Sequence, residues 1–141
     1  MFHLIYTSIE QQEFSAPDLK TLLVSARLRN HEADVTGILV YHSGMFLQAL
    51  EGDEAAVRAV FSRIEKDPRH GDVTIVSRNV SIGKRRMFGD WSMAFADAGG
   101  VAHILKGFID LKSGLSLLAL DEVQALEILT ACSKEPLRLS A

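Results

Sequence analysis

Three neutral hydrogen-bonding side chains, Tyr6, Asn30 and Gln48, stand in otherwise apolar stretches of this 141-residue sequence. Gln48 lies between Leu47 and Ala49, in a run that has the pattern of a buried strand. A carboxamide carries two donors and two acceptor lone pairs, and burying it without partners costs roughly 1–3 kcal/mol. We therefore expect Gln48 to be hydrogen-bonded to a group inside the fold.

Taken singly, each of these three side chains could belong to a structural polar network. Taken together, they also suit a bound polar heteroaromatic ring. A flavin has acceptors at its carbonyls and N5 and a donor at N3, which two amides and one phenol can match. Such a ring could lie against the sheet, in a groove between two helices.

Charged residues near the end of the second predicted helix could extend this site. Asp67, Arg69 and His70 would lie at the mouth of the groove, and with Arg29 and Arg63 they could hold a phosphate or a ribityl chain. On spacing alone, the more common explanation is an exposed helix C-terminus that is enriched in basic residues.

The sequence contains no residues with the spacing of a catalytic triad, a glycine-rich phosphate loop or a metal site. Its five histidines are scattered, and its one cysteine, Cys132, is typical of a small apolar residue in a helix. Glu51 and Asp53 fall at a predicted helix start, where capping, solvent and the helix dipole explain their charge. These features favour a binding module over an enzyme.

Composition and charge indicate one globular domain. With 48% hydrophobic residues, the chain can bury a core. A net charge of −3 and a pI near 5.9 argue against a nucleic-acid surface, which is normally strongly basic. The N-terminus lacks a signal-peptide pattern, and no apolar run approaches the ~20 residues that span a membrane. We therefore expect a soluble, cytoplasmic protein.

Hydrophobic periodicity predicts an alternation of strands and helices. Ser15 and Asp18 indicate the start of the first helix, whose apolar stripe ends at Asn30, and Ser43-Gly44 indicates a hairpin turn. The predicted elements are a strand over residues 2–9, a helix from 15 to about 30, strands over 35–41 and 45–50, a helix from 53 that ends before Pro68, and strands over 72–82 and 91–96.

The order β-α-β-β-α-β-β predicts an α+β, ferredoxin-like sheet with one extra strand. Two helices cover one face of such a sheet and leave the other face open. The C-terminal residues can supply the missing cover. Their spacing predicts a helix over 101–111 and a second helix that begins between Leu115 and Asp121 and ends near Cys132, with Asp121 and Gln124 as a possible cap.

These residues as an ordered set resemble the BLUF family, the blue-light sensors that use FAD. The resemblance covers residues 1 to about 97. It rests on the strand with Tyr6, the helix that ends at Arg29-Asn30, the run D-V-T-G-I-L-V-Y, the run F-L-Q-A-L-E-G around Gln48, and the later D-P-R-H and W-S-M. Each piece alone is weak, but the set at these spacings is specific.

The resemblance implies non-covalent FAD, with the isoalloxazine ring between the two helices and the sheet. By position, Tyr6 and Gln48 match the photoactive pair, and Asn30 matches the residue that holds the pyrimidine edge of the ring. The other residues implied to hold the cofactor are Arg29, Phe46, Arg63, Asp67, Arg69 and His70. The family mechanism implies that Tyr6 gives an electron and then a proton to the excited flavin. Gln48 then rearranges by rotation, tautomerisation or both, and a stronger hydrogen bond to a flavin carbonyl shifts the absorption to the red.

For output, the resemblance implies that Trp91 and Met93 hold switch positions on the last strand, although both could simply be core residues. We expect residues 1–97 to form the flavin-binding domain and residues 98–141 to form its C-terminal helical cap. Such a chain would be a homo-oligomer and would signal to a separate protein, for which a cyclic-dinucleotide enzyme is one candidate.

Two alternatives stay open at the level of sequence. A small hydrolase of the acylphosphatase type would use an arginine and an asparagine on a phosphate, but no glycine-rich anion cradle accompanies Arg69. A ferredoxin-like interaction module without flavin would have the same fold. The absorption spectrum of the purified chain separates these alternatives from a flavin photoreceptor.

Overall fold

The computed structural model describes residues 1–42, 44–80, 86–88, 94–97 and 120–133. The elements in these residues are β1 (Phe2–Glu10), α1 (Ala16–Glu32), β2 (Thr36–His42), β3 (Met45–Gly52), α2 (Glu54–Glu65), β4 (His70–Val80), β5 (Ala94–Asp97) and α4 (Glu122–Ser133). None of the described helices has the length and hydropathy that a membrane span requires.

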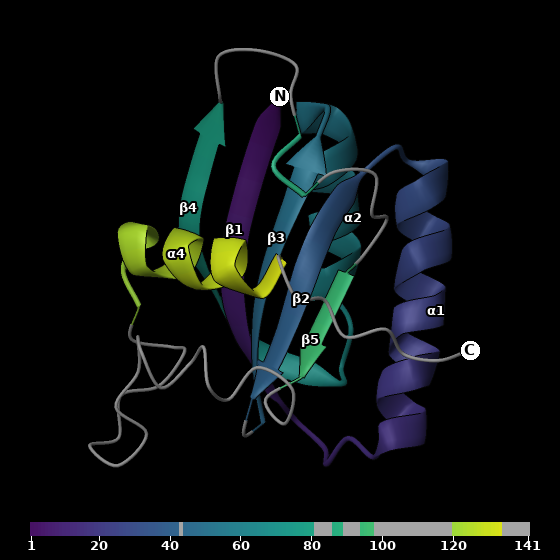
Figure 1. Cartoon of the computed structure of the whole chain (residues 1–141). Coiled ribbons are helices and arrows are strands. Elements are labelled where there is room, and N and C mark those ends of the chain that lie inside the picture. The colour runs from purple at the N-terminus through teal and green to yellow at the C-terminus, as the bar shows by residue number, and fades with distance from the viewer. Residues whose placement is uncertain (43, 81–85, 89–93, 98–119, 134–141) are drawn as a thin grey trace.

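The strands form one sheet in the order β4-β1-β3-β2-β5, in which β1 to β4 pair antiparallel and β5 runs parallel to β2. β3 lies between β1 and β2, and β1 lies between β3 and β4, so α1 and α2 each connect two parallel strands across a third. Because such crossovers are right-handed, both helices lie on the same face of the sheet (Figure 1). The predicted ferredoxin-like order with one added strand is confirmed.

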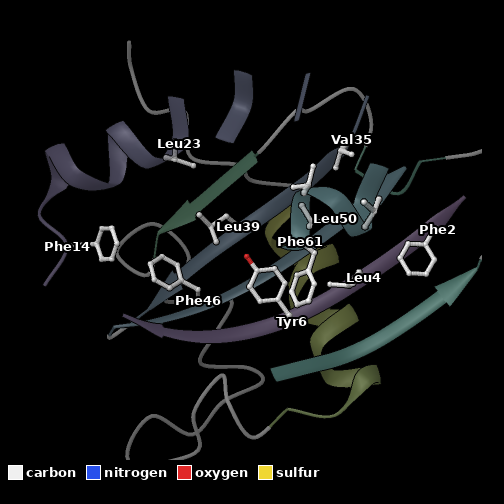
Figure 2. Close-up of a cluster of buried hydrophobic side chains, with 12 residues drawn as sticks. Phe2, Leu4, Tyr6, Phe14, Leu23, Val35, Leu39, Phe46, Leu50 and Phe61 are labelled. Carbon is white, nitrogen blue, oxygen red and sulfur yellow. The ribbon is translucent and has the colours of Figure 1, made fainter. Parts of the chain in front are cut away.

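The sheet has a hydrophobic core on each face. On the face of α1 and α2, Leu4 and Tyr6 of β1 belong to one cluster with Phe61 of α2 (Figure 2). On the opposite face, Ile5 belongs to a second cluster with Ile128 of α4, which crosses the strands (Figure 1). Successive residues of β1 thus enter different cores, which explains its continuous apolar run. The predicted C-terminal cap is confirmed in α4, and the helix predicted over 101–111 lies outside the described residues.

Local hydrogen bonds fix both ends of α1. Ser15 Oγ accepts the backbone N–H of Asp18 at 3.2 Å, and Asp18 Oδ2 accepts the N–H of Ser15 at 3.0 Å, so the predicted cap is a capping box. At the other end, Asp34 has a φ of 54°, and the Val35 N–H bonds to the Asn30 carbonyl at 2.8 Å. This terminal motif holds the last turn of α1 beside the start of β2.

Most of the other predicted turns and caps are also present. Gly44, with a φ of 78°, supplies the turn of the β2–β3 hairpin. The predicted cap of α4 is confirmed, because the Gln124 N–H bonds to Asp121 Oδ1 at 2.8 Å. Asp53 occupies the N-cap position of α2 as predicted, but its side chain makes no capping hydrogen bond.

Glu51 is the clearest departure from the sequence-based expectations. Its predicted place was an exposed or capping position at a helix start, and that prediction is wrong: it lies inside β3 and is fully buried. Four groups donate to its carboxylate, namely His3 Nε2 at 3.0 Å, Thr36 Oγ1 at 2.8 Å, and the backbone N–H groups of Met87 at 2.8 Å and Phe88 at 2.9 Å. The donors lie on neighbouring strands and on a distant segment, so local sequence does not reveal them.

These hydrogen bonds decide the charge of Glu51. Burial by itself would raise the pKa of this carboxyl, because desolvation disfavours the charged form. The hydrogen bonds from His3, from the amides of Phe88 and Met87, and from Thr36 together outweigh burial and lower the pKa below its ordinary value of 4.5. Glu51 is therefore a buried anion at neutral pH.

Replacing Glu51 with Gln should lower the free energy of unfolding by roughly 1–3 kcal/mol near neutral pH, because the four donors lose an anionic acceptor. The folded pKa of Glu51 lies below the unfolded one, so its stabilising effect is complete above the unfolded value and is lost as the pH falls through the folded value. Urea unfolding at decreasing pH should show the difference between wild type and E51Q shrinking once the pH is below 4.5.

The matched control is Asp53→Asn, which neutralises an exposed carboxylate that makes no capping hydrogen bond. This variant should change the free energy of unfolding by less than about 0.5 kcal/mol. A difference between wild type and E51Q that is the same at every pH would contradict the assigned charge of Glu51.

Candidate functional site

The centre of the candidate site is a hydrogen bond between side chains on neighbouring strands. Tyr6 of β1 lies directly opposite Gln48 of β3, and the Tyr6 hydroxyl donates to Gln48 Oε1. Both side chains are buried, with only 2% of Tyr6 and 5% of Gln48 exposed. The expected internal partner of Gln48 is therefore Tyr6. Since the carboxamide oxygen faces the phenol, the NH₂ end of the amide is directed away from it.

Tyr6 keeps its proton in these surroundings. Burial raises the pKa of its hydroxyl far above the ordinary value of 10.0, while the charge of Arg29 lowers the pKa and that of Asp67 raises it by smaller amounts. The Tyr6 ring packs against Phe61, with centroids 5.1 Å apart, and its hydroxyl points toward Leu39 (Figure 2). The phenol is thus a neutral, well-positioned donor.

A cavity of about 480 Å³, measured with its open mouth, lies beside this pair. Its lining comes from α1, the C-terminal end of α2 and the sheet. Seven of the predicted cofactor-binding residues line it: Tyr6, Arg29, Phe46, Gln48, Asp67, Arg69 and His70. Asn30 is buried at the end of α1, but it is not among the lining residues.

The other lining residues were not predicted as part of the site. They are Ser8, Phe14, Leu22, Ala26, Leu39 and Ile64. Ser8 follows Tyr6 by two positions and so shares its face of β1, a signal that the sequence does contain. Leu39 lies opposite Gln48 on β2, and this neighbourhood depends on the strand register.

His70 connects the end of α2 to β1 on one side of the cavity. It is the first residue of β4. The sequence predicted that this strand begins at Asp72, so β4 begins two residues earlier than expected. Its Nε2 donates to the Ile64 carbonyl at 2.5 Å, because a carbonyl oxygen can only accept, and its Nδ1 lies 2.8 Å from Ser8 Oγ. The imidazole also meets Phe46 edge to face, with centroids 6.3 Å apart. This bridge holds the ring of His70 in one orientation.

Comparison with known proteins identifies the family. The profile of the family described as "BLUF: Sensors of blue-light using FAD" matches residues 1–94, which include β1 to β4 and both helices that border the cavity. The chain belongs to the BLUF family. BLUF domains sense blue light and bind a flavin.

Individual proteins are also similar to this chain in sequence or in structure. Photoactivated adenylate cyclase subunit beta from Euglena gracilis is 34% identical over 116 residues, which cover 82% of the chain but only 13% of the cyclase subunit. The structure of BlsA in its photo-activated state has a TM-score of 0.78 at 26% identity, and the match covers 94% of both chains. The structure of Klebsiella pneumoniae BlrP1 in a manganese/cy-diGMP complex has a TM-score of 0.65 at 30% identity. This match covers 95% of the present chain and 33% of BlrP1.

The hydrolase alternative is not supported by this BLUF site. Arg69, the cation that a hydrolase would need, is engaged by Asp67, with Nε 2.9 Å and Nη2 2.5 Å from the carboxylate oxygens. The same hydrogen bonds lower the pKa of Asp67, so a negative charge stands beside the guanidinium and opposes a phosphate. Together with the family match, this indicates a sensor domain.

A second groove, of about 470 Å³ with its open mouth, lies between α1 and α2. Arg29 lines both this groove and the first cavity, so the two are adjacent. Arg63, which was also predicted to bind the cofactor, lines only the second groove. The small side chains of Ala33, Ala56 and Ala59 line it as well, which leaves space between the helices.

The residues of the first cavity fit a flavin ring. Phe46 and Leu39 offer apolar surface, while Tyr6 and Gln48 offer hydrogen-bonding groups. Arg29 Nε is buried without a hydrogen-bond partner among the described residues, so it can donate to an acceptor on a bound ring.

Some predictions are not tested by this geometry. The roles of the lining residues toward a flavin stay predictions. Trp91 and Met93 lie outside the described residues, and so does most of the stretch 98–141. Their switch role, and the division into residues 1–97 and 98–141, likewise stay predictions.

Proposed function

We propose that this BLUF chain is a blue-light photoreceptor that holds FAD non-covalently in the first cavity and responds to light through Tyr6 and Gln48. The observation that carries the proposal is the buried hydrogen bond from Tyr6 to Gln48 at the cavity wall. It joins a proton donor to a reorientable amide at the place where the ring would lie. Arg29 and Asn30, at the end of α1, would hold the polar edge of the ring.

Tyr6 is the proposed source of the electron and the proton. A bound flavin supplies light absorption and, once excited, an electron acceptor. Because burial raises the pKa of Tyr6, the hydroxyl does not lose its proton in the dark, and transfer begins only with light. Tyr6 gives up an electron and a proton and later recovers both, so no net oxidation remains in the protein.

Gln48 is the proposed store of the light signal. Its two amide ends are nearly identical in shape but opposite in hydrogen bonding, so rotation or tautomerisation changes the bonds without changing the packing. In the structure, Gln48 Oε1 accepts a hydrogen bond from the Tyr6 hydroxyl. A rearranged amide would donate more strongly to a flavin carbonyl and shift the absorption to the red.

Tyr6→Phe and Gln48→Leu should each abolish the light-induced red shift while the protein still binds flavin. Phe retains the packing on Phe61 but lacks the donor, and Leu lacks both ends of the amide. Absorption spectra of the purified protein with FAD, in the dark and under blue light, test this. Tyr41→Phe is the control, because Tyr41 donates to Glu10 at 2.7 Å and does not line the cavity. A normal shift in either site variant contradicts the assigned roles, and a wild-type chain that stays colourless with added FAD contradicts the photoreceptor itself.

The second groove supports FAD rather than a shorter flavin. A cofactor with its ring in the first cavity could continue past Arg29 into this groove, where Arg63 would meet a phosphate. Arg63→Ala should therefore weaken FAD binding by about tenfold, the size of one charge-assisted hydrogen bond, and leave riboflavin binding unchanged because riboflavin has no phosphate.

Titration of flavin fluorescence with the purified protein measures both affinities. Arg58→Ala is the matched control, because Arg58 is an exposed arginine of the same helix that pairs with Glu54. An Arg63→Ala variant that binds FAD and riboflavin with the affinities of the wild type would refute the phosphate contact.

We also propose that the light signal passes to a separate protein. The Euglena gracilis relative is named as a photoactivated cyclase, and the BlrP1 structure contains cyclic diGMP. A cyclic-dinucleotide enzyme is therefore one candidate partner for this chain. A homo-oligomer is the proposed assembly, and light scattering of the purified chain measures it.

A pull-down from lysate with the chain as bait, in the dark and under blue light, tests the output. One protein should be enriched about fivefold or more in one of the two states, as an ordinary allosteric coupling requires. The captured fraction is then assayed for synthesis or hydrolysis of cyclic dinucleotides. Gln48→Leu, which should bind flavin without responding, should capture equal amounts in both states. Equal capture by the wild type would contradict light-dependent signalling through a partner.

A further inference from the structure

β1, β3 and β2 carry two sets of facing polar side chains, one on each face of the sheet. On the helix face, Tyr6 lies opposite Gln48. Three positions further along β3, and therefore on the opposite face, Glu51 lies between His3 of β1 and Thr36 of β2. The same three neighbouring strands thus position both the candidate photoactive pair and the buried carboxylate.

Each carboxylate oxygen of Glu51 accepts two hydrogen bonds. Oε1 accepts Thr36 Oγ1 and the Phe88 N–H, and Oε2 accepts His3 Nε2 and the Met87 N–H. Each oxygen therefore joins one donor on a neighbouring strand to one donor on the segment 86–88. A change in the position of β3 relative to β1 or β2 must alter at least one of these shared bonds, because hydrogen bonds weaken steeply with poorer geometry.

The segment 86–88 is tied to the sheet and to the core beneath α4. Arg86 donates to Thr36 Oγ1 at 2.9 Å and to the Asp34 carbonyl at 3.0 Å. Phe88 is 2% exposed and belongs to the hydrophobic cluster that also contains Ile128 and other residues of α4. In the chain this segment lies between β4 and β5, the two edge strands of the sheet.

We propose that Glu51 is a latch that couples the cavity side of β3 to the α4 side. When Gln48 changes its hydrogen bonds, β3 shifts against β1 and β2, and the bonds from Glu51 to Met87 and Phe88 loosen. The segment 86–88 and the core under α4 then respond, although neither touches the cavity. This inference rests on the proposed function, since it needs a light-driven change at Gln48.

A fully buried carboxylate is an unusual choice for a purely structural contact. Removing a charge from water costs several kcal/mol, and well-packed apolar groups often stabilise a core as well or better. A carboxylate with two oxygens and four donors can instead respond to small displacements of three separate chain segments. The position of Glu51 on the same strand as Gln48 makes that response sensitive to the site.

Backbone hydrogen exchange of Met87 and Phe88 tests the latch directly, in flavin-loaded wild-type protein in the dark and under blue light. Illumination should raise the exchange rate of both amides by about tenfold or more, since each loses protection when its bond to Glu51 loosens. The absorption spectrum is recorded on the same sample. A red shift without any change at these two amides overturns the latch alone, and a wild-type chain without a red shift overturns the proposed function together with it.

Glu51→Gln separates the latch from the photochemistry. The variant should keep the red shift, because Glu51 faces away from the cavity, but Met87 and Phe88 should exchange fast in the dark and no longer respond to light. Asp53→Asn, a nearby exposed carboxylate, should behave like the wild type. If E51Q does not fold, Thr36→Val is used in its place. This variant removes one hydrogen-bond donor to Glu51 and leaves the charge of Glu51 unchanged. A wild-type light response of Met87 and Phe88 in E51Q, or in Thr36→Val if that variant is used, would also overturn the latch.

Discussion

The antiparallel pairing of β1 with β3 is the constraint on which the site depends. It places Tyr6 opposite Gln48, and because side chains alternate along a strand, both face α1 and α2. A shift of the strand register by one residue would turn both side chains toward α4. The apolar residues of the strand would then face away from the cores that they fill. The register is held because β1 is buried on both faces, with Leu4 in one core and Ile5 in the other.

β3, the central strand of the sheet, carries two buried polar side chains, Gln48 and Glu51. Gln48 is satisfied by Tyr6 of β1, and Glu51 by His3 of β1 and Thr36 of β2. Unsatisfied, either group would cost roughly 1–3 kcal/mol or more. The two groups therefore need the strand neighbours that they have, and the strands in turn are fixed in register by these bonds as well as by apolar packing.

The cavity is bordered by both helices and by the sheet. α2 lies close to β1 and β3, and its residues Val57, Val60 and Phe61 are buried. The capping box at Ser15 and the terminal motif at Asp34 fix the ends of α1. On its other side the cavity is bordered by the end of α2, where His70 is held by two hydrogen bonds.

The elements, their order and the burial of Asn30 and Gln48 could be predicted from the sequence, because periodicity, capping residues and turn glycines act over a few neighbouring positions. Seven of the residues around the cavity also followed from sequence, through the family pattern, whereas others such as Ser8 and Leu39 did not. The partner of each buried polar group could be identified only from the folded chain. Glu51 looked like a capping or solvated acid, yet its donors come from two other strands and a distant segment. The strand register and the position of the segment 86–88 depend on many contacts between residues that are far apart in the sequence. A local sequence pattern does not predict such contacts.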